Sequence, residues 1–299
     1  MDALYNKSAP EARRSTYMLF NLILIILGLA ASLLTYFLTP LFAMHWAYAF
    51  LILPMWLGYW IAILGVITVT FTFVCYLISL SKKEVEKPSK FAYWCCSGII
   101  YWLFGFLWIK TTITGKELLP KDTRFLMVSN HISMFDFLIV FAKLGSYQIV
   151  PITKKETFDY PWAGPVAKAS GFIPIDRENP AKGLRAILKA IRLIKNDLSS
   201  IFIAPEGTRS LGGRMNPFHA GSFKIAEKSK CPIVVACVSG TDAIHKNFFR
   251  RVSHVRLDIL EVLSSEEVSN MTTLAMADHC QQLIQDYLDG LEENATTKE

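Results

Sequence analysis

The octapeptide Ser129–Asp136 carries a histidine, His131, and an aspartate, Asp136, five residues apart. The four residues before it are apolar, as in a buried strand, and the five after it continue as a predicted helix. Ser133 is placed to cap that helix, with Asp136 at the capping-box position three residues later. Such a helix would turn the Asp136 carboxylate toward the imidazole, and a histidine held by a carboxylate can act as a general base. The alternative is structural, with Asp136 only a helix cap and His131 an ordinary turn residue.

Three further stretches place polar residues directly after an apolar segment, where open α/β sheets have their sites. They are Asp176–Arg177 after 171–175, Ala204–Ser210 after 201–203, and Ser239–Thr241 after 231–235. The second stretch is chemically the richest. Gly207 permits close approach of backbone to a ligand, Thr208 offers a hydroxyl, and Arg209 offers a planar donor suited to phosphate. Taken alone, it could equally be an ordinary turn with a surface ion pair.

The chain of 299 residues is 52% hydrophobic, and the excess lies near the N-terminus. No Asp, Glu, Lys or Arg occurs from Ser15 to Ser81. This run is far longer than the roughly 20 residues that one membrane crossing needs. We therefore expect an N-terminal membrane region over 1–87, with two transmembrane helices at about 17–38 and 47–80.

Basic pairs flank this run, Arg13–Arg14 before it and Lys82–Lys83 after it, which predicts that both ends lie on the cytoplasmic side. Residues 88–110 form a second apolar stretch, rich in aromatic side chains. A third crossing there would move the rest of the chain to the opposite face. We therefore expect an interfacial aromatic helix over 88–110, and a multi-pass membrane protein whose remaining domain is cytoplasmic.

From residue 111 to 299 the pattern is that of a water-facing α/β domain. The predicted strands are Thr111–Thr114, Phe125–Ser129, Gln148–Thr153, Ile201–Ala204, Ile233–Val238 and Val255–Leu260. Most are continuous apolar runs, typical of strands covered on both faces, but the last alternates and should be an edge or half-exposed strand. Asn179–Pro180 should open a helix. Its predicted apolar stripe is Leu184, Ile187, Leu188, Ile191 and Ile194.

Charge and cysteine content narrow the function classes. The net charge is +6, but the basic residues are scattered and form no nucleic-acid-binding module. Anionic lipid headgroups or phosphorylated substrates are the expected partners, and nucleic acid is not.

The six cysteines include no C-x-x-C pair, which indicates free thiols in a reducing compartment and predicts no metal site.

The polar stretches occur in an order that resembles a known family. N-H-x-x-x-x-D, G-F-I-P-I-D-R, P-E-G-T-R-S and C-P-I-V together resemble the motifs of the glycerolipid acyltransferases, and are closest to the 1-acylglycerol-3-phosphate (lysophosphatidic acid) acyltransferases. Lys154–Glu156 with Pro161 and Gly164, and the segment 113–120, look like family segments between them. The resemblance covers roughly 110–262 and leaves the first 90 residues uncovered.

The resemblance implies a fold, an activity and residue roles. The fold is a mixed sheet flanked by helices, over an acyltransferase domain at 111–299, preceded here by the two-helix hairpin and the interfacial helix. His131 would be the general base and Asp136 would orient it. Substrate binding would involve Asn130, Lys155, Arg177, Glu206, Gly207, Thr208 and Arg209, and an acyl channel would be lined by Pro232 and Ile233.

The implied reaction transfers a fatty acyl group from acyl-CoA or acyl carrier protein to the free hydroxyl of a lysophospholipid. The acceptor would be 1-acyl-sn-glycerol-3-phosphate and the product phosphatidic acid, with no cofactor. Two alternatives stay open: another lysolipid acceptor, or a membrane-bound thioester or lipid hydrolase using the same histidine. A covalent route through Ser133 lacks the G-x-S-x-G elbow that serine nucleophiles use in hydrolases.

Overall fold

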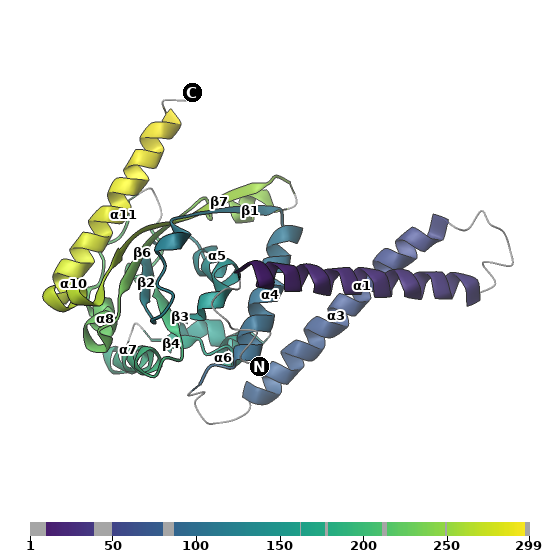
Figure 1. Ribbon diagram of the computed structural model, residues 1–299, viewed down its shortest axis with the longest axis horizontal. Coiled ribbons are helices and arrows are strands. Elements are labelled where there is room, and N and C mark those ends of the chain that lie inside the picture. Colours follow the sequence, from purple (N-terminus) through teal and green to yellow (C-terminus); the bar gives the residue numbers. More distant parts are fainter. Residues whose placement is uncertain are drawn as a thin grey trace. The chain divides into compact units, whose positions relative to one another are not determined.

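The computed structural model describes residues 10–38, 50–79, 87–161, 163–176, 179–210, 214–248 and 250–296. The chain divides into two compact units, Met1–Ser81 and Lys82–Glu299 (Figure 1).

The described part of the first unit is dominated by two long helices, α1 (Pro10–Leu38) and α3 (Ile52–Ser79). They pack against one another and cross (Figure 1). The indole of Trp56 donates to the carbonyl of Ile25 at 3.1 Å, and the hydroxyls of Thr35 and Tyr59 are hydrogen-bonded at 2.8 Å. These bonds satisfy polar side chains inside an otherwise apolar pair.

Only α3 is long and apolar enough to cross a bilayer among the described helices. Its segment Ile52–Leu77 has 26 residues with a mean hydropathy of 2.2, and almost none of it is buried within the protein. The apolar part of α1, Leu22–Leu38, is shorter. The predicted hairpin of two spanning helices therefore stays a prediction, and its turn at 39–49 lies outside the described residues.

The second unit begins with α4 (Lys90–Phe106), which the hydroxyl of Ser89 caps by accepting the N–H of Ala92 at 3.2 Å. One face is part of the domain core. There the buried Tyr93 hydroxyl accepts the N–H of Ile149 at 2.9 Å and donates to its carbonyl at 3.0 Å. The helix is shorter than the predicted 88–110, because Ile109 already begins a strand.

Seven strands form one sheet in the described residues, in the order β1-β7-β6-β2-β5-β3-β4. Their bounds are β1 Ile109–Thr114, β2 Leu126–Ser129, β3 Ile149–Lys154, β4 Ile173–Ile175, β5 Ser200–Ile203, β6 Ile233–Ser239 and β7 Ser253–Leu263. β6 and β7 pair antiparallel and the other neighbours pair parallel, so the sheet is mixed, as predicted. The three-residue edge strand β4 was not predicted as a strand.

Helices cover both faces of this sheet. They are α5 Phe135–Lys143, α6 Ala163–Ala169, α7 Pro180–Lys195, α8 Lys224–Ser229, α9 Ile244–Asn247, α10 Ser265–Asn270 and α11 Thr273–Thr296. Figure 1 shows α4 and α5 on one side of the sheet and α7, α8 and α11 on the other. The core between the sheet and the first pair includes Met127, Phe202 and Val234, all nearly or fully buried.

Two sequence predictions need correction in detail. β7 is not an edge strand, since it lies between β1 and β6, but burial does alternate along its first half, as its pattern predicted.

On α7 the cap and first residue are as expected, with the Asn179 side chain accepting the N–H of Lys182 at 3.2 Å. The predicted stripe is partly wrong, because Leu184 and Leu188 are exposed. The small side chains of Ala186 and Ala190 are buried instead, together with Ile191, Leu193 and Ile194.

Candidate active site

The carboxyl ends of three adjacent parallel strands lie side by side, and the residues that follow these strands form the candidate site. The central strand β2 lies between β5 and β6 and is parallel to both. His131 follows β2, Glu206 follows β5, and Thr241 follows β6. The carboxyl ends of parallel strands meet at one edge, which is where open α/β sheets bind ligands.

The His131 ring is hydrogen-bonded to the Asp136 carboxylate, with 2.9 Å between Nδ1 and Oδ2. The aspartate is 1% exposed and the histidine side chain 25% exposed. Oδ2 also accepts the backbone N–H groups of Ile132 and Ser133, each at 2.8 Å. Because a carboxylate oxygen accepts hydrogen bonds, the geometry assigns a ring proton to Nδ1.

Asp136 holds the backbone just before α5 and the ring of the histidine at once, so the structural and the chemical interpretations of the octapeptide are not exclusive. It accepts the N–H of Ser133, which is one half of the expected capping box. The other half is shifted by one residue, since the Ser133 hydroxyl accepts the N–H of Phe135 at 3.3 Å. The N-cap of α5 is Met134, whose side chain makes no capping bond, so the prediction that Ser133 caps the helix is wrong by one residue, and the helix begins at Phe135.

The backbone of His131 is held from both sides. Its N–H donates to Oε1 of Glu206 at 2.6 Å, and its carbonyl accepts the N–H and hydroxyl of Ser210 at 2.8 and 3.1 Å. The other Glu206 oxygen accepts the N–H of Asn216 at 2.8 Å. Burial raises the pKa of Glu206, while the N–H groups of Asn216 and His131 act in the opposite direction. These contacts make Glu206 a positioning group for the histidine.

Asn130 joins the end of β2 to β6. Its side-chain amide donates to the carbonyl of Val238 and accepts the N–H of the same residue, both at 2.8 Å. The side chain is fully buried. Both polar ends of the amide are thus engaged with backbone, one residue before the histidine.

The sequence predicts no role for Thr241, although its segment follows an apolar strand. Its hydroxyl donates to Oδ1 of Asp136 at 2.5 Å, and the residue is fully buried. Asp136 therefore accepts hydrogen bonds from the threonine, the imidazole and two backbone N–H groups.

The turn after β5 presents Thr208 and Arg209 to solvent. Gly207 has φ +73°, a conformation that favours glycine, and a Cβ there would come within 3.0 Å of the His219 ring. Asn216 lies 3.4 Å from the hydroxyl and the carbonyl of Thr208. A larger residue at position 207 would therefore strain the turn that carries Thr208 and Arg209.

One more predicted binding residue, Lys155, directly follows β3. Lys155 pairs with Asp176 at 3.1 Å, and Lys182 approaches the same carboxylate oxygen at 3.6 Å. Arg177, predicted to bind phosphate, lies outside the described residues.

Pro232 and Ile233 lie at the opposite end of the parallel strands, where β2 and β6 begin. Ile233 begins β6 and pairs with Leu126, at the start of β2, and both Pro232 and Ile233 are buried. With about 3.3 Å per residue, β6 separates Ile233 from Ser239 by about 20 Å. The structure does not bring these two residues beside the His131 imidazole.

The buried cysteine of β6, Cys237, is not a thiolate nucleophile at neutral pH. Burial and the nearby Asp258 raise the pKa of Cys237 to about 12, so this residue is a neutral thiol. Within the described ranges, no group of three or more His, Cys, Asp or Glu side chains is arranged to hold a metal ion.

Comparison with known proteins identifies the family. The acyltransferase family model matches residues 110–239. A 1-acyl-sn-glycerol-3-phosphate acyltransferase of Limnanthes alba is 37% identical over 156 residues, which cover 51% of this chain and 53% of that protein. One of Borreliella burgdorferi is 31% identical over 191 residues, covering 60% of this chain and 72% of that protein. The chain belongs to the 1-acyl-sn-glycerol-3-phosphate acyltransferase family.

Membership of this family confirms the resemblance that the four motifs predicted. The chain spans about half the length of the Limnanthes relatives that it matches. The crystal structure of the 1-acyl-sn-glycerophosphate (LPA) acyltransferase PlsC from Thermotoga maritima has a TM-score of 0.57 and 20% identity, and the match covers 92% of this chain and 98% of that one. That likeness shows that the two proteins share a fold.

Proposed function

We propose that this protein transfers a fatty acyl group from acyl-CoA or acyl carrier protein to 1-acyl-sn-glycerol-3-phosphate, giving phosphatidic acid. One observation carries the proposal. The imidazole of His131 is bonded to a buried Asp136, whose two oxygens are held by Thr241 and the backbone of the same turn. Relatives named as acyltransferases of this acceptor support the choice of substrate.

In the proposed reaction, Nε2 of His131 removes the proton of the acceptor hydroxyl as the oxygen attacks the thioester carbonyl carbon. The carbon–sulfur bond then breaks, and the departing thiolate takes the proton from the imidazolium. Asp136 stabilises that imidazolium and keeps the ring in the Nδ1–H form. No acyl-enzyme and no cofactor take part. A general base of this kind accelerates a reaction by about 10² to 10⁴.

The acceptor phosphate would be bound by cations at the same edge of the sheet. Arg209 is exposed on the turn after β5, and Lys155 follows β3. Arg177 is proposed as a third cation from the family motif alone. Thr208 would add a hydroxyl donor beside Arg209.

The other predicted binding residues contribute by shaping the site. Glu206 accepts the backbone N–H of His131. Asn130, the residue before the histidine, is hydrogen-bonded through its side chain to the backbone of Val238. Gly207 gives the turn its left-handed residue. The acyl-channel role of Pro232 and Ile233 would require an acyl chain that reaches the far edge of the sheet.

We propose that α1 and α3 hold the enzyme in a membrane, with both flanks and the acyltransferase domain on the cytoplasmic side. The apolar segment Ile52–Leu77 supports one crossing. Large apolar side chains of α4 that are exposed, Phe91 and Leu103 among them, support the interfacial position of that helix. Membrane anchoring suits a reaction whose acceptor and product both reside in the bilayer.

The test is a lipid-product assay on membranes that carry the full chain, with a panel of lysolipid acceptors and with acyl-CoA or acyl carrier protein as donor. His131→Ala should lose about 10² to 10⁴ of the rate. The matched control is His279→Ala, because this exposed histidine pairs with Glu261 on the protein surface. Wild-type acylation by His131→Ala membranes would overturn the mechanism. Fast release of free fatty acid from acyl-CoA without any acceptor would favour a hydrolase instead.

A further inference from the structure

An exposed apolar patch lies beside the catalytic turn. Met134, the residue just before α5, is 68% exposed, and Trp108, between α4 and β1, is 52% exposed. Other large apolar side chains that are exposed nearby in the fold are Phe106, Phe248 and Val252. We call these five residues the apolar rim.

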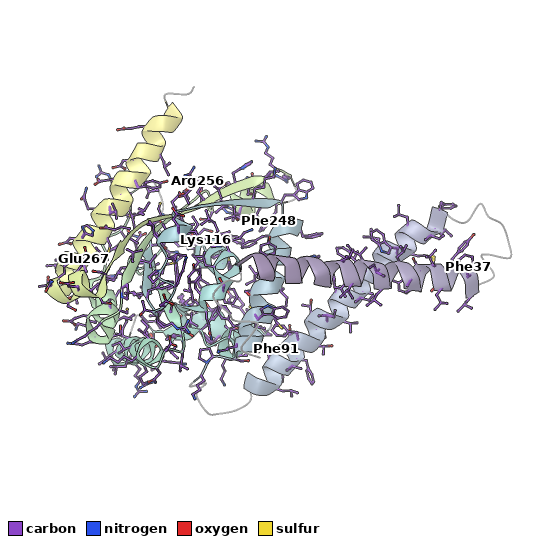
Figure 2. All side chains as sticks on the ribbon, viewed as in Figure 1. Phe37, Phe91, Lys116, Phe248, Arg256 and Glu267 are labelled. Carbon is purple, nitrogen blue, oxygen red and sulfur yellow. The ribbon has the colours of Figure 1, made fainter. Side chains whose placement is uncertain are left out.

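The contacts of the fold join three segments into this apolar rim. The rings of Phe135 and Phe248 meet edge to face, with centroids 6.0 Å apart, so the catalytic turn adjoins the segment after α9. The N–H of Ser253 donates to the carbonyl of Trp108 at 3.1 Å, which joins that segment to the end of α4. Figure 2 shows Phe248 near the ends of the sheet where β1 and β7 begin.

Cations border the apolar rim. Lys246, Arg250 and Arg251 are exposed in the same connection that carries Phe248 and Val252. Lys110, the second residue of β1, is also exposed. Between residues 241 and 254 the sequence contains one acidic residue, Asp242. Within the described ranges, no ion pair joins these cations to a carboxylate.

We propose that the apolar rim and these cations bind the surface of a membrane containing anionic lipids, and thereby hold the catalytic turn at that surface. This inference rests on the proposed function, since a lipid acceptor is what brings the catalytic turn to a bilayer. Apolar side chains enter the boundary between headgroups and acyl chains, while lysine and arginine are attracted to anionic headgroups. The residues of this contact all belong to the second unit, so the contact would orient that domain at the membrane surface.

The charge contribution can be tested in the full chain. The protein is placed in nanodiscs of phosphatidylcholine alone or with added phosphatidylglycerol, and hydrogen exchange of the 244–253 backbone and the acylation rate are measured. The variant combines Lys246→Glu, Arg250→Glu and Arg251→Glu. Its control combines Arg185→Glu, Arg192→Glu and Lys195→Glu on α7, with the same change in net charge and equally exposed positions.

For the wild type and the α7 control, phosphatidylglycerol should slow exchange in 244–253 at least about fivefold, which is the effect of one cation near an anionic surface. The triple variant should lose that response, and high salt should weaken the response of the wild type. Equal responses of the two variants, or no slowing in the wild type, would overturn the inference. The exchange measurement needs no turnover, so slowed exchange without acyl transfer would reject the proposed function and leave the membrane contact standing.

The apolar contribution has its own matched pair. Phe248→Ser with Val252→Ser should lose part of the exchange protection on both kinds of nanodisc. Leu184→Ser with Leu188→Ser removes two exposed apolar side chains of α7 and should leave the protection unchanged. Equal loss in both pairs would mean that the apolar rim makes no specific contact.

Discussion

Thr241 donates its hydroxyl to Oδ1 of Asp136 at 2.5 Å, from the end of a different strand and 105 residues along the chain. The imidazole of His131 occupies the other oxygen, Oδ2, at 2.9 Å. The two bonds fix the plane of the carboxylate. Since Asp136 is buried, loss of one donor would not be replaced freely by water.

Thr241→Val should therefore lower kcat by about tenfold or more, because a hydrogen bond to a charged group contributes about 1.5–3 kcal/mol. The KM values for donor and acceptor should change little, since the threonine hydroxyl is hydrogen-bonded to Asp136 and has no proposed role in binding substrate. Steady-state kinetics on mixed micelles would measure both constants. Thr241→Ser retains the hydroxyl and should restore most of the rate. A valine variant with wild-type kcat would remove Thr241 from the positioning of the dyad.

The local part of the site could be predicted from sequence. His131 and Asp136 are five residues apart, so one turn and one helix start bring them together without help from the rest of the chain. Six of the seven strands of the described sheet were predicted, most of them as the continuous apolar runs that are typical of buried strands. β4 was missed, since three residues carry too little pattern.

The long-range part could not be predicted from spacing alone. Asn130 bonds to Val238 across 108 residues, and Glu206 reaches the His131 backbone across 75. These partners meet only because β2 lies between β5 and β6, and strand order is not written in local periodicity. The predicted apolar stripe of α7 was partly wrong because the packing of the helix against the rest of the domain, and not local apolarity, decides which face is buried. The buried face carries Ala186 and Ala190, although Leu184 and Leu188 are more apolar.

Asn130→Asp should destabilise the domain by about 3 kcal/mol, because a buried group loses its bond and a carboxylate oxygen then faces the carbonyl of Val238. The melting temperature of the detergent-solubilised protein would report this loss. Asn270→Asp, at the exposed end of α10, is the control and should melt like the wild type. Equal melting of the two variants would show that the amide pair adds no stability.

Arg209→Gln should raise KM for the phosphate-bearing acceptor by about tenfold, since a charge-assisted hydrogen bond is replaced by a neutral one. With monoacylglycerol, which has no phosphate, the rate should be the same for variant and wild type. Comparing the two acceptors in one assay separates phosphate binding from general damage. Arg192→Gln, on the exposed face of α7, should affect neither. An equal loss with both acceptors would argue against a phosphate contact of Arg209.

Glu206 should make stability depend on pH in a defined direction. Burial raises its pKa in the folded protein, so the folded chain keeps this proton at pH values where the unfolded chain has released it. Unfolding then releases a proton, and the free energy of unfolding falls as pH rises from the ordinary carboxyl pKa through the raised one. Below that window the contribution of Glu206 is fully present.

Glu206→Gln cannot ionise and should lack this dependence, although it lowers stability by a constant amount through its altered bonds to His131 and Asn216. Melting temperatures of the two proteins across the acidic range give the comparison. The wild type should lose stability relative to Glu206→Gln as pH rises through the window, and the difference should level off above it. A constant difference at every pH would mean that the folded and unfolded chains hold the Glu206 proton equally.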